Sequence, residues 1–123
     1  MNYKVQFISR DEVVEESLWI QMDGIVLNVF CCDYNFKFER LKDYQVELEF
    51  NIFDEYQVSE SNLPAQLRKI DQSFSYEVIG VLDNGTITIG DFKVFDEILL
   101  SDYGCLEGKN ICWRVDRIDM SID

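Results

Sequence analysis

The sequence of 123 residues contains no histidine, one proline and only 11 lysine and arginine residues, against 24 aspartate and glutamate residues. The lack of histidine removes the commonest general base, every Ser-His or Cys-His nucleophile pair and all imidazole metal ligands. No apolar run approaches the roughly 18 residues that a membrane-spanning helix needs. The N-terminal residues also lack the apolar core of a signal peptide. We therefore expect a cytoplasmic protein.

Apolar residues make up 47% of the chain and aromatic residues 14%. This composition excludes an intrinsically disordered chain, and the length suits one hydrophobic core. The sequence has no internal repeat, low-complexity tract or linker. It predicts a single globular domain over residues 1–123.

The formal net charge of −13 is the strongest feature of the composition. Between residues 43 and 91 there are ten acids and two bases, a local charge of about −8 (10 − 2). Nucleic acids and anionic membranes attract basic proteins, so neither is an expected partner. The acidic stretch fits a solvated surface that self-repulsion keeps soluble, and it equally fits a face for a basic protein partner, because complementary charge accelerates association.

Alternating apolar and polar residues predict that most of the chain forms β-strands. Residues 44–52 give the clearest pattern, with apolar side chains at even positions, so that one face of the strand points inward. Similar patterns predict strands at 3–7 and 111–116, and Asn84-Gly85 predicts a hairpin turn. Residues 18–32 fit either one strand bent at Gly24 or a hairpin that turns there.

One short helix is predicted at about residues 62–71. Ser61 or Asn62 can cap it, and Leu63, Leu67 and Ile70 recur with helical spacing. The predicted fold class is therefore all-β, or β-rich α+β. It is a small antiparallel barrel or sheet of about five to seven strands with this one helix.

The order of the predicted strands is similar to that of an OB-type barrel. In this scheme residues 18–32 form a bent first strand, followed by strands at 35–39, 44–53, 74–82 and 86–95. The strands at both ends of the chain are extra. A sandwich, or an open antiparallel sheet with one helix, is the alternative. Such barrels often bind oligonucleotides, but Glu47 and Glu49 on an exposed face argue against that function here.

The four cysteines are expected to be reduced thiols in a cytoplasmic protein. Their spacing does not match the paired Cys-x-x-Cys units of zinc sites, and no EF-hand or phosphate-binding motif occurs. The sequence therefore predicts no cofactor, no metal ligand and no catalytic residue. A weak calcium site formed by surface acids stays open.

Acidic residues next to aromatic residues mark the predicted partner-binding site. Glu47 and Glu49 share the exposed face of the strand at 44–52, and residues 54–60 combine a tyrosine with carboxylates. Aromatic anchors inside a charged rim are typical of protein interfaces. The predicted partner-binding residues are Glu47, Glu49, Asp54, Glu55, Tyr56 and Glu60.

Size, acidity and the missing histidine together favour an acidic protein-interaction module. An inhibitor or immunity-type partner of a basic protein, such as a nuclease, has these properties. The alternative is a small β domain that binds a small ligand or a metal without catalytic activity. A third hypothesis is an enzyme that uses carboxylates such as Glu47 and Glu49 as acid and base. The sequence favours a protein without catalytic activity over this enzyme.

Overall fold

The computed structural model describes residues 2–33 and 36–122, and it divides the chain into two compact units. The barrel unit comprises Met1–Asn51 and Asp116–Asp123, and the sheet unit comprises Ile52–Val115. The described residues are mostly β-strand, with one short α-helix and one 3-10 turn, so the predicted all-β class is confirmed. No helix in the described part of the chain has the length and apolar character that crossing a membrane requires.

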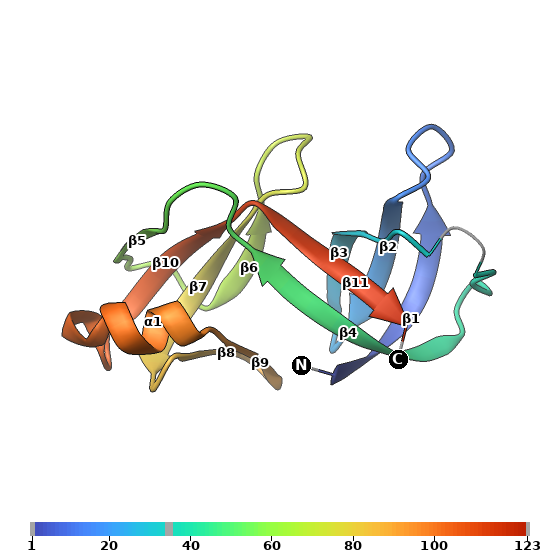
Figure 1. Cartoon of the computed structure of the whole chain (residues 1–123). Coiled ribbons are helices and arrows are strands. Elements are labelled where there is room, and N and C mark those ends of the chain that lie inside the picture. Colours follow the sequence, from blue (N-terminus) through green and yellow to red (C-terminus); the bar gives the residue numbers. More distant parts are fainter. Residues whose placement is uncertain (1, 34–35, 123) are drawn as a thin grey trace. The chain divides into compact units, whose positions relative to one another are not determined.

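The barrel unit is a closed five-stranded barrel in the order β1-β2-β3-β11-β4 (Figure 1). All neighbouring strands pair antiparallel except β3 and β11, which are parallel, and β4 closes the barrel by pairing with β1. Its strands are β1 (Asn2–Arg10), β2 (Ser17–Met22), β3 (Ile25–Phe30), β4 (Asp43–Asn51) and β11 (Arg117–Ile122).

This strand order is that of an OB-type barrel, in which the last strand lies between the third and the fourth. The likeness predicted from the sequence therefore holds, but the strands assigned to it were wrong. Residues 74–82 and 86–95 belong to the sheet unit, whereas the strands at both chain ends, thought to be extra, are barrel strands. The whole sheet unit is inserted between the fourth and fifth strands of the barrel.

The barrel interior follows the alternation in the sequence. On β4 the side chains of Val46 and Leu48 are buried while Glu47 and Glu49 are exposed, so the strand predicted at 44–52 is confirmed. The hairpin alternative for residues 18–32 is also confirmed, because β2 and β3 turn at Asp23-Gly24. The inward side chains of the five strands make one core, with these fully buried members: Leu18, Ile20, Leu27, Val29, Val46 and Ile118.

The connection from β3 to β4 contains no strand among its described residues. The strand predicted at 35–39 is therefore wrong for residues 36–39, and Asn35 lies outside the described residues. Phe38 stacks on Phe7 of β1 at 5.2 Å between ring centroids and contacts Tyr44 edge-on at 5.2 Å. The aromatic side chains thus pack onto the barrel instead of alternating along a paired strand.

The sheet unit is a six-stranded antiparallel sheet. Its order is β5-β10-β7-β8-β9, and β6 also pairs with β7 (Figure 1). The hairpin predicted at Asn84-Gly85 is confirmed between β7 and β8. The strands are β5 (Gln57–Glu60), β6 (Gln66–Lys69), β7 (Tyr76–Asp83), β8 (Thr86–Ile89), β9 (Phe92–Phe95) and β10 (Asn110–Val115).

The helix predicted at about 62–71 is wrong, because residues 66–69 form strand β6. Leu67 pairs with Val78 and Arg68 with Glu77 on β7, and these long-range partners override the local helical spacing. The hydroxyl of Ser61 accepts a hydrogen bond from the amide of Leu63 in a short turn, not at a helix start. The α-helix is instead α1 (Glu97–Asp102), and the 3-10 turn η1 (Gly104–Leu106) follows it.

Candidate functional site

A groove on the outer face of the barrel contains two of the predicted residues, Glu47 and Glu49. Because Val46 and Leu48 point into the core, these two glutamates project outward from β4. The groove has a volume of about 460 Å³ and runs across strands β3, β11 and β4. Its lining residues are Phe30, Cys32, Glu47, Leu48, Glu49, Asp119, Met120 and Ser121.

Two carboxylates that line this groove are neighbours on adjacent strands. In the pairing of β4 with β11, Glu49 lies directly opposite Asp119, and Glu47 lies opposite Ser121. Like charges at opposite positions of neighbouring strands destabilise a sheet. Arg117 relieves part of this repulsion, since its Nε and Nη2 atoms donate to the Asp119 carboxylate at 2.5 and 2.9 Å.

An aromatic ring adjoins these charges. The guanidinium carbon of Arg117 lies 3.9 Å from the ring centroid of Phe30, a cation–π contact at short range. The Asp119 carboxylate raises the pKa of Arg117 above its already high ordinary value. Acidic side chains, an aromatic ring and a stacked guanidinium therefore occur together on this face.

Tyr56, predicted as an aromatic anchor for a partner, makes its main contacts within the sheet unit. Its hydroxyl donates to the Asp96 carboxylate, with distances of 3.0 and 2.9 Å to the two oxygens. Its ring stacks on buried Trp113 at 6.1 Å and on Tyr103 at 6.3 Å between centroids. Burial and the neighbouring Asp96 carboxylate raise the pKa of Tyr56.

Asp96 connects this tyrosine to α1. Its Oδ2 atom also accepts the amide of Leu99 at 3.2 Å, so the same carboxylate caps the helix. The loop that precedes β5 is thereby held against the start of α1. Asp54 and Glu55, directly before Tyr56, are exposed on this loop.

The remaining predicted residue, Glu60 on β5, has a partner within the chain. Its Oε1 atom lies 2.8 Å from the Nζ atom of Lys109, and this carboxylate raises the pKa of Lys109. The six predicted residues are thus distributed over both units: Glu47 and Glu49 belong to the barrel unit, and Asp54, Glu55, Tyr56 and Glu60 belong to the sheet unit.

The sequence reasoning missed the contributions of Phe30 and Asp119 to the groove. They come together through the parallel pairing of β3 with β11, where Asp119 pairs with Phe30, and these two strands are far apart in the chain. The alternation of Arg117, Asp119 and Ser121 with buried Ile118 and Met120 is a usable signal for an outward face. This alternation does not identify the strands that lie beside β11.

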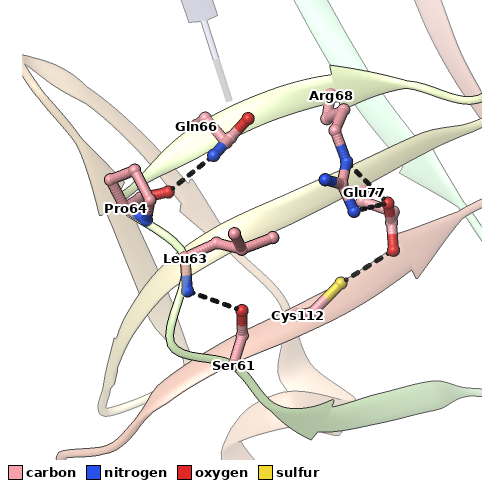
Figure 2. Close-up of polar contacts among 7 residues, drawn as sticks. All are labelled: Ser61, Leu63, Pro64, Gln66, Arg68, Glu77 and Cys112. Atoms are coloured by element: carbon pink, nitrogen blue, oxygen red, sulfur yellow. Dashed lines mark hydrogen bonds and ion pairs between the residues drawn. The ribbon is translucent and has the colours of Figure 1, made fainter.

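A second polar cluster lies on one face of the sheet unit (Figure 2). Glu77 of β7 accepts two hydrogen bonds from Arg68 of β6, at 2.9 and 2.6 Å, and one from the Cys112 thiol of β10 at 3.1 Å. The Arg68 guanidinium lowers the pKa of Glu77. Burial and, second, the Glu77 carboxylate raise the pKa of Cys112 to about 11. Cys112 is therefore a protonated thiol at neutral pH.

A pocket of about 280 Å³ borders this cluster and is lined by Gln57, Val58, Ser59, Glu77, Cys112 and Arg114. All four cysteines of the chain are free. Among residues 2–33 and 36–122, no three Cys, Asp or Glu side chains come together in a group that could hold a metal ion.

The barrel, the inserted sheet and the acidic groove define a small all-β protein whose barrel carries a groove lined by three carboxylates. The family model described as "Uncharacterised conserved protein UCP019853" matches residues 1–122, and the chain belongs to this family. No curated protein and no solved structure matches the sequence.

Proposed function

We propose that this chain is an acidic protein-interaction module of the cytoplasm that binds a basic protein, in the manner of an inhibitor or an immunity-type partner. A nuclease is one example of such a basic protein. The net charge of −13 supports the proposal at the level of the whole chain. The acidic groove of the barrel unit supports it at the level of a site.

The observation that carries the proposal is the alignment of Glu49 opposite Asp119, with Glu47 two residues away on the same face. A lysine or arginine side chain of a partner, bound in this groove, would remove the repulsion between Glu49 and Asp119. Phe30 offers such a side chain an aromatic neighbour, as it does for Arg117 in the free chain. Charge steering by the surrounding acids would raise the association rate.

The first test identifies the partner. The tagged chain is used to capture proteins from native cytosol, and the complexes are washed at about 0.05 M and then 0.5 M salt, where the Debye lengths are roughly 14 and 4 Å. We expect one basic protein in near-equal amount, held more weakly at high salt. Recovery of the same background proteins at both salt concentrations would contradict the proposal.

The second test uses the recovered partner. Neutralising the groove with Glu47→Gln/Glu49→Gln should lower the association rate about tenfold at low salt and flatten its salt dependence. Glu12→Gln/Glu15→Gln is the matched control, because these exposed acids belong to the same unit and change the net charge equally. Equal rates for the two double variants would remove the groove from the proposal.

The alternative function, a ligand-binding β domain, is favoured by one observation. The pocket beside Glu77 contains the exposed Arg114 guanidinium, which has no ion-pair partner among the residues that the structure describes. A small carboxylate or phosphate suits such a donor. A rise in melting temperature with acetate or phosphate, abolished by Arg114→Gln, would support this alternative.

A further inference from the structure

Two exposed apolar side chains meet at the tip of the β7–β8 hairpin in the sheet unit. Phe95 is 42% exposed and Leu100 is 48% exposed. A Cβ atom placed on Gly85 would lie 2.8 Å from Cβ of Leu100 and 3.0 Å from Cε2 of Phe95. Both side chains therefore lie over the same glycine, and they form one contiguous patch, here called the hairpin–helix patch.

Two carboxylates lie next to the hairpin–helix patch, and the segment that contains the patch is acidic. The Glu107 carboxylate accepts the amide of Asn84 at 3.1 and 3.0 Å, which places it at the hairpin tip beside Gly85. The side chain of Asp96, directly after Phe95, is held by Tyr56 and by the start of α1. Residues 83–107 contain six acids and one base, a charge of −5 (6 − 1).

We infer that the hairpin–helix patch is the apolar anchor point for the basic partner, a protein that presents an apolar side chain among lysines or arginines. This inference rests on the proposed function, from which it takes the basic character of the partner. An aromatic and an aliphatic side chain inside a charged rim match the anatomy of interface hot spots. A second copy of this chain fits less well, because two copies of a segment with a formal charge of −5 repel each other.

Single exposed apolar residues are common on protein surfaces and carry no meaning alone. The hairpin–helix patch differs because Phe95 and Leu100 come from separate elements and converge on Gly85. The Tyr56–Asp96 hydrogen bonds also hold the predicted loop, with Asp54 and Glu55, against the start of α1. Two of the predicted partner-binding acids thus lie on a loop fixed to the same helix that supplies Leu100.

Two synthetic peptides test this anchor on the full chain. One is oligolysine, and the other has the same number of lysines interleaved with leucine and tryptophan. At moderate salt we expect the apolar peptide to bind about tenfold more tightly than oligolysine, a difference that burial of two side chains can supply. Phe95→Ser/Leu100→Ser should reduce this preference to about twofold or less.

Val81→Ser is the matched control, because Val81 on β7 is 50% exposed, close to the value for Leu100. Amide chemical-shift changes induced by the apolar peptide should centre on residues 83–85 and 95–107. A preference that survives in Phe95→Ser/Leu100→Ser, or that Val81→Ser lowers equally, would overturn the anchor and leave the basic-partner proposal standing. Failure of both peptides to bind at low salt would count against both.

Discussion

The Asp96 carboxylate holds two parts of the sheet unit together through single hydrogen bonds. It accepts the Tyr56 hydroxyl from the loop before β5 and the Leu99 amide from α1. A hydrogen bond to a charged acceptor contributes more stability than one between neutral groups. The phenol oxygen of Tyr56 therefore adds a polar contact to the ring stacking that holds the predicted loop.

Replacing Tyr56 with phenylalanine removes that oxygen and keeps the ring stacked on Trp113. We expect the free energy of unfolding at neutral pH to fall by about 1.5 kcal/mol, measured by urea denaturation. Tyr103→Phe is the control. The Tyr103 ring stacks on the Tyr56 ring, but the Tyr103 hydroxyl makes no hydrogen bond to the described residues. A loss of equal size in both variants would contradict a special role for the Tyr56 hydroxyl.

The same tyrosine predicts a difference at alkaline pH. The pKa of Tyr56 is raised in the folded chain above its ordinary value of 10.0, so between the two values the folded state binds more protons than the unfolded state. Its contribution to stability is thus complete below about pH 10 and declines as the pH rises further. Tyr56→Phe should show a shallower alkaline decline in denaturation measurements, because it lacks this titrating group. Tyr3 and Cys112, whose pKa values are also raised, remain in both proteins, so the difference between the two curves comes from Tyr56.

At the scale of secondary-structure elements, the hairpin tips at Gly24 and Gly85 share a backbone conformation and differ in their surroundings. Asp23 and Gly24 have φ of 51° and 79°, and Asn84 and Gly85 have φ of 50° and 77°. A Cβ atom on Gly24 would meet nothing within 4 Å, whereas one on Gly85 would collide with Leu100 and the backbone oxygen of Asp96. Gly85 therefore permits both the turn and the close approach of α1.

Alanine at these two glycines separates the two effects. Gly24→Ala should cost about 1 kcal/mol, which is the strain of a left-handed conformation. Gly85→Ala should cost about 3 kcal/mol, because the same strain is joined by displacement of Leu100. Urea denaturation of both variants checks the difference, and equal losses would show that α1 moves away from the hairpin at little cost.

The elements that the sequence predicted correctly are those whose signals are local. Alternation in residues 44–52 reflects a strand with one buried face, and Asn84-Gly85 is suited to positive φ at both positions. The helix prediction for residues 62–71 failed because the same residues can form either a helix or a strand. The pairing of Leu67 with Val78 on β7 favours the strand. The true helix is only six residues long, so its side-chain periodicity is too short to recognise, although Asp96 is a suitable cap.

At the scale of the whole molecule, the acidic charge belongs to both units. The barrel unit has 13 acids and six bases, a charge of −7 (13 − 6), and the sheet unit has 11 acids and five bases, a charge of −6 (11 − 5). The acidic middle of the sequence crosses the boundary at Asn51 and so does not form one unit of structure. The six predicted residues are therefore divided between the two units, because the inserted sheet unit begins directly after Asn51, between Glu49 and Asp54.

Closure of the barrel could not be predicted from alternation. The strand that completes the barrel, β11, is separated from β3 and β4 in the sequence by the whole sheet unit. Asn51 at the end of β4 pairs with Arg117 at the start of β11, and the Asp116 amide donates to the Asn51 carbonyl at 2.9 Å. The two ends of the insertion therefore meet within the barrel unit. When the two ends of an inserted domain lie close together, the domain that receives the insertion can typically fold without it.

Replacing residues 52–116 with Asn-Gly should therefore leave a folded barrel. The two-residue turn joins Asn51 to Arg117 as an antiparallel hairpin, and the core of Leu18, Ile20 and Val29 remains complete. We expect a dispersed amide spectrum and cooperative thermal unfolding at lower stability, as suits a domain of about 60 residues. Ile20→Asp in the shortened chain is the control and should abolish both signals. A collapsed spectrum of the shortened chain would instead favour the single domain predicted from the sequence, since the barrel would then need the inserted sheet in order to fold.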